Sequence, residues 1–589
     1  MMERAERVLK SYYGYATFRD GQKKVIRSVL DKKDTLGIMP TGGGKSICYQ
    51  VPAMLMQGTT IVISPLISLM KDQVDGLDSI GIPAAYINSS LTYAQVELRI
   101  NKAARGEYKL LYVAPERLES ERFIDLMSEV EVPMVAVDEA HCVSQWGHDF
   151  RPSYLAISRL VERLPQRPIV AAFTATATDQ VREDIVKHLQ LQEPDMHVTG
   201  FARENLAFSV IKGENKRDVM LDYIREHSEE VGIVYAATRK EVDNLYELLR
   251  KNKVPVGKYH AGLSDKERAE AQEQFLYDEV RVIVASNAFG MGIDKSNVRY
   301  VIHYNMPKNM EAYYQEAGRA GRDGEPSECM LLFSPQDIHI QKFLIEQSIA
   351  DPARQAQEYR RVQQMADYCH TSQCLQRYIV RYFGDDCEDC GRCSSCSTER
   401  QLTDITVESQ KIFSCVRRMR ERFGATTVAA VLKGSRSKKV IELGFHELST
   451  YGLLKDRTEK EIVDLIQLLV AEGYLIITEG KYPVLRLAPK AQSVLSGEER
   501  VVQKMRIRTE PAVRDVESEL FDQLRGLRLE IARREGIPPY IVFPDSTLRE
   551  MCGVKPTNPA AMLKIKGVGE AKFFKYGAYF IEFFKNLNE

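Results

Sequence analysis

A glycine-rich stretch near the start of the chain has the composition of a phosphate-binding loop. MPTGGGKS (39–46) follows the apolar run TLGIM and precedes ICYQVPAML, so we expect it at a turn from a strand to a helix. Consecutive glycines let backbone N–H groups surround phosphate oxygens at a helix N-terminus, a lysine can reach the terminal phosphates, and a serine hydroxyl can hold Mg²⁺. The predicted nucleotide contacts are Thr41, Gly42, Gly43, Gly44, Lys45 and Ser46.

An acidic pair further along the chain strengthens this interpretation. The loop alone is ambiguous, because Met39 replaces the first glycine of the strict G-x-x-x-x-G-K-[ST] pattern and a glycine-rich turn with an exposed lysine would look similar. Asp138 and Glu139 end the apolar run MVAV, where a strand would deliver both carboxylates to the edge of a sheet. In ATPases one such acid holds Mg²⁺ and its neighbour orients or deprotonates the attacking water. Together the two segments predict nucleotide hydrolysis.

The stretch CVSQWGHDFRP, directly after the acids, holds the single tryptophan of the chain, Trp146. Tryptophan, phenylalanine and arginine stack on the bases of single-stranded nucleic acid or bind its phosphates. A loop joined to Glu139 can therefore report bound DNA to the nucleotide site. The alternative is a core tryptophan packed under a turn, which the polar neighbours disfavour. The predicted coupling residues are Gln145, Trp146, His148, Phe150 and Arg151.

Short apolar runs in the first 330 residues indicate the strands that would position these residues. Near-continuous apolar runs are typical of strands buried on both faces, and helix-like stretches such as DQVREDIVKHLQL separate them. This alternation predicts two tandem α/β domains with parallel sheets, divided near residue 205. The predicted strands are TTIVIS (59–64), MVAVD (134–138), IVAAF (169–173), GIVYA (232–236), RVIVAS (281–286) and YVIHY (300–304).

After residue 345 the parallel-strand pattern gives way to charged helical sequence. The stretch RTEKEIVDLIQLLVAEGYL begins with a capping-box pattern, and the following LIITEGKYPVLRL reads as a hairpin, which together favour a winged helix. Residues 411–439 contain nine Lys and Arg against one acid, so we expect duplex phosphates to bind there, with a solvated helix face as the alternative. The wing tip carries Lys481 and Tyr482, and its use as a strand-separating wedge is doubtful. A polar linker at 508–516 precedes a small helical domain.

The bulk composition limits the classes of protein that remain. At 589 residues the chain is long enough for about four domains, and 81 Lys and Arg against 82 Asp and Glu leave a net charge of -1, so any nucleic-acid surface must be local. The N-terminus lacks the apolar core of a signal peptide, and no stretch offers 18 uninterrupted apolar residues. We therefore expect a soluble cytoplasmic protein without a membrane partner.

Six of the 11 cysteines lie between Cys369 and Cys396, which in a reducing compartment indicates a metal site. The motif CGRCSSC spaces Cys390, Cys393 and Cys396 closely enough for three thiolates to share one tetrahedral Zn²⁺. Free structural cysteines are the alternative. The candidates for the fourth ligand are Cys374, Cys369, Cys387 and His370.

Eight segments, taken in chain order, resemble the motifs of superfamily 2 helicases, and specifically of RecQ-type DNA helicases, over nearly the whole chain. The tetrapeptide DEAH also occurs in the RNA helicases named after it, but their phosphate loops and third motifs read differently from PTGGGKS and TATAT. The segments are GYATFRDGQ (14–22), PTGGGKS, SPLISLMKDQ, APERL, DEAH, TATAT, ASNAFGMGIDK and YYQEAGRAGRDG.

The resemblance implies an ATP- and Mg²⁺-dependent helicase that moves 3′-to-5′ on single-stranded DNA and unwinds duplex or branched DNA in recombination and repair. It also implies a nucleoid-associated monomer with single-stranded-DNA-binding protein as a further partner. The expected domains are two RecA-like motor domains at 1–205 and 206–345, a zinc-binding subdomain at 346–402, a winged helix at 403–500, a linker at 501–516 and a helical domain of the helicase-and-RNase-D C-terminal (HRDC) type at 517–589.

Residue roles that rest on the resemblance complete the predicted site. Tyr15, Arg19 and Gln22 match an adenine-recognising motif. Arg319 and Arg322 would come from the second motor domain and stabilise the transferring phosphoryl group. Arg322 is the first choice for the arginine finger, the residue that contacts this group from the other domain. Gln315 would assist them, Asp294 would couple the cleft to DNA, and Cys374 would be the fourth zinc ligand.

The last domain is similar to HRDC domains but its role is open. Gly567 and Gly569, beside Lys566 and Lys572, would allow a phosphate to approach the backbone, or would form only a tight turn between helices. Two rival functions also remain: an ATP-driven RNA remodeller, and a DNA-junction scaffold with a vestigial motor. Preference for RNA in stimulating ATPase activity would favour the first, and indifference to Glu139→Gln would favour the second.

Overall fold

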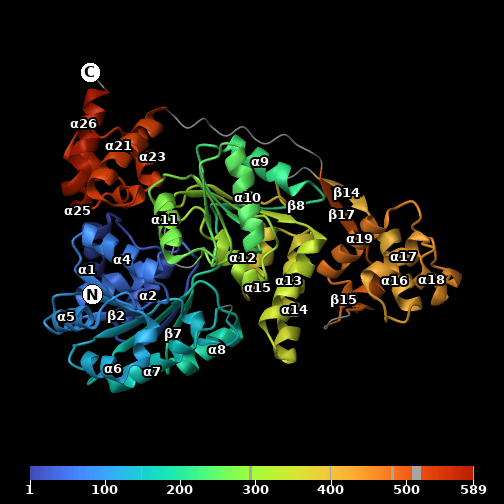
Figure 1. Cartoon of the computed structure of the whole chain (residues 1–589), viewed down its shortest axis with the longest axis horizontal. Helices are drawn as coiled ribbons and strands as arrows, with labels where there is room; N and C mark the ends of the chain where they lie inside the picture. The colour runs from blue at the N-terminus through green and yellow to red at the C-terminus, as the bar shows by residue number, and fades with distance from the viewer. Residues whose placement is uncertain (148, 291–294, 398–399, 479–482, 507–518, 588–589) are drawn as a thin grey trace.

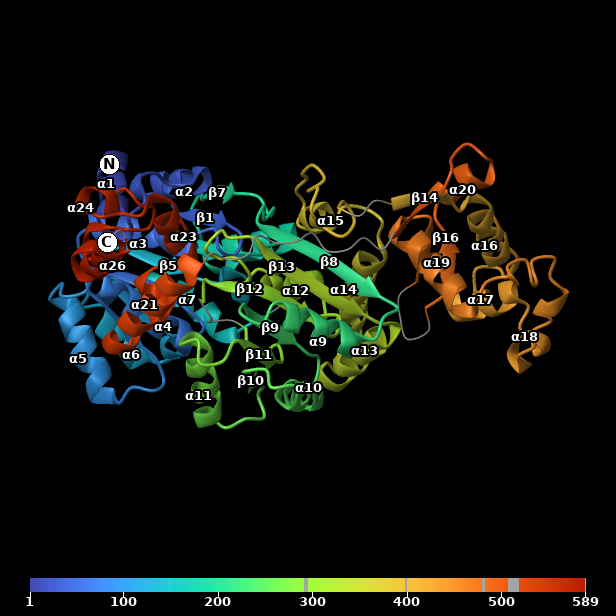
Figure 2. The same ribbon diagram turned by 90° about the horizontal axis from the view of Figure 1, so that it is seen from above.

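Two parallel sheets, each covered by helices on both faces, form the centre of the molecule (Figure 1). The computed structural model describes residues 1–147, 149–290, 295–397, 400–478, 483–506 and 519–587. The predicted residues His148, Asp294, Lys481 and Tyr482 and the predicted linker 508–516 lie outside them. In the two views the winged-helix region extends from one end of the motor, and the HRDC region packs on the first motor domain at the other end (Figures 1 and 2).

The first sheet is seven-stranded and its strands are buried almost throughout, which is why they read as continuous apolar runs. Its strand order is β3 (Ala84–Ile87), β4 (Leu110–Val113), β2 (Thr60–Ile63), β5 (Met134–Val137), β6 (Ile169–Thr174), β1 (Thr35–Ile38) and β7 (Asp195–Val198). Its helices are α1 (Met2–Val8), α2 (Asp20–Leu30), α3 (Lys45–Leu55), α4 (Ile67–Ser79), α5 (Tyr93–Ala104), α6 (Glu121–Met127), α7 (Ile157–Arg163) and α8 (Asp179–His188).

The second sheet has six strands, and its pairs are parallel as in the first. Its strand order is β10 (Val256–Tyr259), β11 (Val282–Ala285), β9 (Val231–Tyr235), β12 (Val298–His303), β13 (Ser327–Phe333) and β8 (Leu206–Lys212). Its helices are α9 (Lys216–Glu226), α10 (Arg239–Lys251), α11 (Asp265–Leu276) and α12 (Met310–Ala317). The predicted α/β class with two parallel sheets is confirmed.

The predicted apolar runs do not include β3, β4, β7, β8, β10 or β13. Of these, β4 and β13 lie inside the sheets and are largely buried, so exposure does not explain their omission. β7 and β10 are partly exposed, so their sequences DMHV and VGKY mix polar with apolar residues. Periodicity detects a strand by its buried faces, and an edge strand with one solvated face has little of that signal.

A helical region and a winged helix follow the motor. Helix α14 packs on both α13 and α19, and Ser372 donates its backbone N–H to Glu472 at 2.9 Å, which fixes the winged helix to the zinc-binding region. The predicted hairpin is present, with β15 and β16 antiparallel. The elements are α13 (Pro335–Ser348), α14 (Pro352–His370), α15 (Leu375–Tyr382), β14 (Arg400–Asp404), α16 (Thr406–Arg418), α17 (Ala425–Lys433), α18 (Lys438–Glu442), α19 (Glu459–Ala471), β15 (Leu475–Ile477), β16 (Leu485–Leu487), α20 (Lys490–Leu495) and β17 (Val502–Arg506).

The last domain is entirely helical over the described residues and has its own apolar core, with Leu524, Phe543 and Phe580 fully buried. Arg528 is buried within this domain, where it donates to the Phe543 carbonyl and to Asp545, both at 2.8 Å. The helices are α21 (Glu519–Glu535), α22 (Pro539–Val542), α23 (Asp545–Val554), α24 (Pro559–Met562), α25 (Glu570–Lys572) and α26 (Ala578–Asn586).

A buried carboxylate at the start of β1 holds three segments of the first sheet together. Asp34 accepts from the Val170 backbone at 2.9 Å and the Gln192 backbone at 2.8 Å, and pairs with Arg167 at 2.6 Å. Because Asp34 is almost fully buried, these partners replace the water that the carboxylate loses on folding. The strand that leads into the glycine-rich loop is thereby tied to its neighbours.

Asp34→Ala should lower the free energy of unfolding of the first motor domain by about 1–3 kcal/mol, because the backbone N–H groups of Val170 and Gln192 and the Arg167 guanidinium lose their acceptor. Denaturant unfolding followed by fluorescence or circular dichroism would measure the change. Asp31→Ala, an exposed neighbour, is the matched control and should change stability by less than about 0.5 kcal/mol. Equal stability of the two variants would contradict the structural role of Asp34.

Candidate nucleotide-binding and DNA-coupling site

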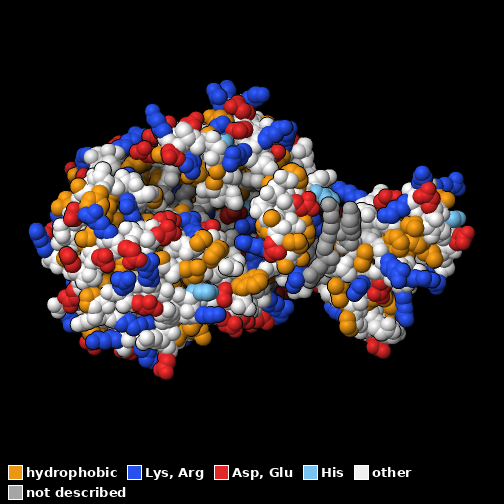
Figure 3. Space-filling view, turned by 60° about the horizontal axis from the view of Figure 1, so that its bottom comes forward, with side chains coloured by type: hydrophobic (Ala, Val, Ile, Leu, Met, Phe, Trp, Pro, Cys, Tyr) orange, Lys and Arg blue, Asp and Glu red, His pale blue; other side chains and the backbone are white. Residues whose placement is uncertain are grey.

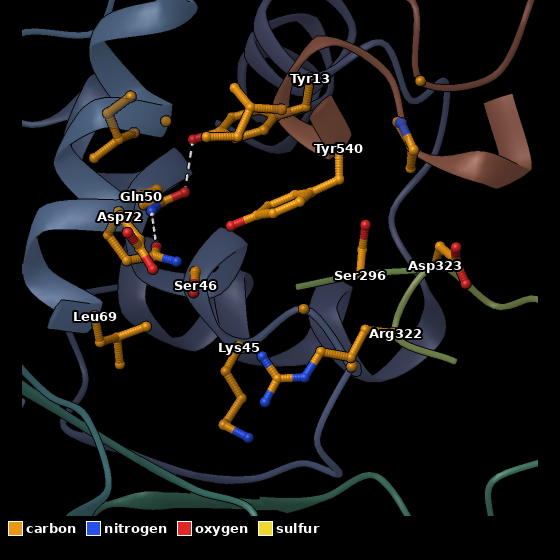
Figure 4. Close-up of a pocket in the computed structure, with 18 of the residues that line it drawn as sticks. Tyr13, Lys45, Ser46, Gln50, Leu69, Asp72, Ser296, Arg322, Asp323 and Tyr540 are labelled. Carbon is orange, nitrogen blue, oxygen red and sulfur yellow. Dashed lines mark hydrogen bonds between the residues drawn. The ribbon is translucent and has the colours of Figure 1, made fainter. Parts of the chain in front are cut away.

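A cavity of about 440 Å³ lies where the first motor domain, the second motor domain and the last domain meet (Figure 4). Its size is in the range of sites that bind small molecules. The phosphate loop, both acids and the arginines of the second motor domain line it. The predicted site residues among its lining are Tyr15, Arg19, Thr41, Gly42, Gly44, Lys45, Ser46, Asp138, Glu139, Gln315, Arg319 and Arg322.

The phosphate loop forms the predicted turn between β1 and α3. Gly42 and Gly44 have φ of +75° and +77°, values that favour glycine. Lys45 begins α3 and donates to the Met39 carbonyl at 3.3 Å. Burial lowers the pKa of Lys45, and the neighbouring Glu139 and Asp138 partly oppose this shift.

The start of α2 holds this loop from one side. Gln22 donates to the Gly43 carbonyl at 3.1 Å and receives the Arg19 backbone N–H at 3.1 Å. Arg19 in turn donates to the Gly42 carbonyl at 2.8 Å. The structure thus brings the predicted adenine-recognising residues, with Tyr15 at the cavity wall, against the phosphate loop.

The acidic pair lies at the carboxyl end of β5, as its position after an apolar run predicts. The Asp138 backbone still hydrogen-bonds to Ile63 of β2, while Glu139 has φ of +48° and turns the chain away from the sheet. His141 contacts Glu139 at 3.3 Å and Thr174 at 2.9 Å. Burial lowers the pKa of His141 to about 3, so this ring is neutral near pH 7.

Cations from the second motor domain enter the same cavity. Gln315 lies on α12, and Arg319 and Arg322 follow it. Figure 4 shows the Arg322 side chain extending toward Lys45. A Cβ at Gly318 would stand 1.9 Å from the Thr41 hydroxyl oxygen, so the GRAGR segment needs glycine to approach the phosphate loop this closely.

Arg203 joins the phosphate loop to the GRAGR segment, and sequence analysis missed it. Its buried guanidinium donates to the carbonyls of Thr41 and, at 3.3 and 3.1 Å, of Gly318 and Ala320. Five N–H donors on one rigid group suit such a multiple contact between backbone segments. Nothing in the local sequence FARENL signals the role, because the acceptors lie in distant segments.

The loop that contains Trp146 follows the acidic pair, Asp138 and Glu139, and leads back to the first sheet. Trp146 is 45% exposed, so the alternative of a buried core tryptophan is wrong. Ser144 receives the Trp146 backbone N–H at 3.1 Å and donates to Asp184 at 2.6 Å. Arg361 of α14 donates to the Trp146 carbonyl at 2.6 Å, so the zinc-binding region contacts the loop directly.

The other residues of this loop differ in their exposure and in their hydrogen bonds. Gln145 is exposed beside Trp146, and Phe150 is partly buried. Arg151 donates to the Pro65 carbonyl at 2.9 Å and pairs with Asp149 at 3.0 Å, so in this structure it braces the loop against the segment after β2. The predicted phosphate-binding role of Arg151 would require these contacts to change.

The cysteine cluster is assembled by Cys374 at the start of α15 and by three cysteines in the segment that follows α15. The sulfur atoms of Cys374, Cys390, Cys393 and Cys396 lie within 4.8 Å of one another. Backbone N–H groups of Leu375 and of Cys390 itself point at the sulfurs of Cys393 and Cys374 at 3.3 Å, which stabilises thiolates. Four thiolates at this spacing fit tetrahedral Zn²⁺, and among the described residues no other such group of His, Cys, Asp and Glu occurs. The predicted zinc site, with Cys374 as the fourth ligand, is confirmed.

Basic side chains are visible on the winged-helix lobe (Figure 3). The hydrogen bonds of Lys439 to Thr427 and of Lys433 to the Lys455 carbonyl hold two of the predicted cations on the surface of this domain. The nine cations of the predicted phosphate-binding stretch are Lys411, Arg417, Arg418, Arg420, Arg422, Lys433, Arg436, Lys438 and Lys439.

Comparison with known proteins agrees with this organisation. Family models match in chain order: DEAD/DEAH box helicase at 19–185, helicase conserved C-terminal domain at 215–324, RecQ zinc-binding at 335–397, RQC domain at 399–512 and HRDC domain at 517–583. Within the described residues, no helix is long and apolar enough to cross a membrane.

Relatives match over nearly the full length. The ATP-dependent DNA helicase RecQ of Bacillus subtilis is 52% identical over 99% of this chain and 98% of its own. The ATP-dependent DNA helicase RecQ of Haemophilus influenzae is 40% identical over 98% of this chain and 94% of its own. With both motor domains, the four-cysteine site, the winged helix and the last helical domain in place, this chain belongs to the RecQ family of ATP-dependent DNA helicases.

Proposed function

We propose that this chain hydrolyses ATP to move 3′-to-5′ along single-stranded DNA and to unwind duplex or branched DNA in recombination and repair. The observation that carries the proposal is the meeting of the phosphate loop, the acid pair and the second-domain arginines around one cavity, with the Trp146 loop continuous with the acids. We further propose that the chain acts as a monomer and has single-stranded-DNA-binding protein as a partner.

The side chains divide the hydrolysis reaction among them. Lys45 binds the terminal phosphates, Ser46 and Asp138 would hold Mg²⁺, and Glu139 accepts a proton from the attacking water. When bound, the ion would supply charge neutralisation to the phosphate group. His141 is neutral and contacts both Thr174 and Glu139 through one ring nitrogen, Nδ1, so it lies beside the carboxylate of Glu139 without adding charge.

ATP hydrolysis depends on closure of the two motor domains, because positive charge that stabilises the reaction comes from the second motor domain. Arg322, with Arg319 and Gln315, stabilises the negative charge that grows on the transferring phosphoryl group. Arg203 keeps the segment that carries them against the phosphate loop. DNA on the Trp146 loop would act on the same centre through the short connection to Glu139. Asp294 remains a proposed coupling residue of the same cleft.

Glu139→Gln should lower DNA-stimulated ATP hydrolysis by about 10²-fold or more while nucleotide binding persists, because the amide accepts no proton from water but keeps the shape of the carboxylate. Steady-state phosphate release and binding of a fluorescent ATP analogue would measure the two properties. Glu129→Gln, an exposed site before β5, is the control. Unchanged hydrolysis in Glu139→Gln would favour the scaffold with a vestigial motor.

Trp146→Ala should reduce the stimulation of ATP hydrolysis by single-stranded DNA about fivefold or more, since stacking contributes ~1–3 kcal/mol per base. Hydrolysis without nucleic acid, with DNA and with RNA of equal length would be compared for both proteins. Tyr93→Ala removes another exposed aromatic ring of the same domain and should retain full stimulation. Stronger stimulation by RNA would instead support the RNA remodeller.

Cys393→Ser should release zinc and lower the thermal midpoint of the protein, because one buried thiolate of four is lost and metal binding stabilises the fold. Metal content by atomic emission and a thermal melt would measure both effects. Cys387→Ser, a nearby cysteine outside the cluster, should retain one zinc per chain. Loss of zinc from Cys387→Ser alone would show that the ligand set is different.

A further inference from the structure

The last domain contacts the first motor domain through backbone. A Cβ on Gly14 would stand 2.5 Å from the Gly569 nitrogen, and a Cβ on Gly569 would stand 2.9 Å from the Tyr12 carbonyl oxygen. Lys10 also donates to the Leu563 carbonyl at 3.4 Å. The GVG turn is therefore packed against the segment that precedes the adenine-recognising residues, which is a contact that neither sequence interpretation of these glycines anticipated.

The same domain also contacts the second motor domain. Arg549 pairs with Glu325 at 3.0 Å, and the Tyr277 hydroxyl donates to the Gly536 carbonyl at 2.9 Å. The ammonium of Lys295 lies 5.8 Å from the centre of the Tyr540 ring. The last domain thus bridges the two motor domains across the cavity that they share.

Tyr540 and Lys572 are among the residues of the last domain that line this cavity together with Lys45 and Arg322. Tyr540, on α22, extends its ring into the cavity, and its hydroxyl end lies toward Ser46 and Gln50 (Figure 4). Lys572, on α25, also lines the cavity and donates to the Ile541 carbonyl at 2.6 Å. Burial lowers the pKa of Lys572 to about 8, so near pH 7 it still adds positive charge to the wall.

The cavity stays large with the last domain docked. Its volume of about 440 Å³ is measured with Tyr540 and Lys572 in place, and sites for small molecules have comparable volumes. An obstructing plug would fill the space beside the phosphate loop. A wall leaves that space open and adds a third side to it, which is the arrangement seen here.

We propose that the docked last domain is a third wall of the nucleotide site, in which Tyr540 and Lys572 slow the release of nucleotide. The proposal rests on the proposed ATPase function of this site. Because the domain contacts both motor domains, the wall is complete only when they are close together. Nucleotide exchange is then coupled to their separation, and undocking of the last domain opens a path for ADP to leave.

Dissociation of a fluorescent ADP from the full-length protein, chased with excess ATP in a stopped-flow instrument, tests the proposal. Tyr540→Ala should speed dissociation about threefold or more. Arg549→Glu should do the same by placing two acids together at the docking contact, and Glu325→Arg in the same chain should restore slow release. Tyr579→Ala, an exposed tyrosine of the same domain outside the cavity lining, is the matched control and should leave the rate unchanged.

The charge-reversal pair distinguishes a role of Arg549 in docking the last domain from a purely structural role. If Arg549→Glu only impaired folding, the added Glu325→Arg substitution would not restore slow release. Unchanged or slower dissociation in Tyr540→Ala would overturn the proposal, and slower dissociation with tighter binding would identify Tyr540 as an obstruction. If the unaltered protein bound no ADP, the proposed ATPase function itself would fail. Intact ADP binding with a release rate indifferent to Tyr540 and Arg549 would refute the third wall alone.

Discussion

The close approach of the phosphate loop and the GRAGR segment is the constraint on which the rest of the structure depends. Phosphate binding needs one set of donors from the strand-to-helix turn after β1, and charge stabilisation needs a second set from a different domain. The buried guanidinium of Arg203 satisfies carbonyls on both sides of the junction, and Gly318 removes the side chain that would keep them apart. The two motor domains are therefore held at a distance at which residues of both line one cavity.

The same junction explains why the remaining modules lie where they do. The Trp146 loop begins at Glu139 and is held by Arg361 from the zinc-binding region, so the proposed DNA-coupling loop and the proposed hydrolytic acids share a short stretch of chain. The four-cysteine cluster joins the start of α15 to the segment that follows it, and Ser372, just before α15, donates to Glu472 of the winged helix. The last domain closes the third side of the cavity. The net charge of the chain is almost zero, and the cations of the site are concentrated around this cavity.

Much of the motor and of the zinc site was predictable because the signals are local. A glycine loop after a buried strand, an acidic pair at the end of another and closely spaced cysteines each depend on neighbours in sequence. The choice of Cys374 needed family resemblance, since spacing left four candidates. Arg203 and Arg361 were missed because each acts on a group from a distant segment, a reason that does not apply to His141, which lies two residues from Glu139. The edge strands β7 and β10 were missed because their exposed faces remove the apolar pattern, whereas β4 and β13 are buried strands that were missed as well.

The sequence by itself determined which chemistry this protein can perform, because residue types and spacing specify phosphate binding, acid-assisted hydrolysis and thiolate ligation of zinc. Buried strands can be predicted from their apolar composition. Only the tertiary structure decided which of those groups share a space. The exposure of Trp146, the brace between Arg151 and Pro65, and the place of Tyr540 beside the phosphate loop all follow from contacts between segments remote in sequence. Such contacts depend on the packing of whole domains, and no local pattern of residues encodes a distance between them.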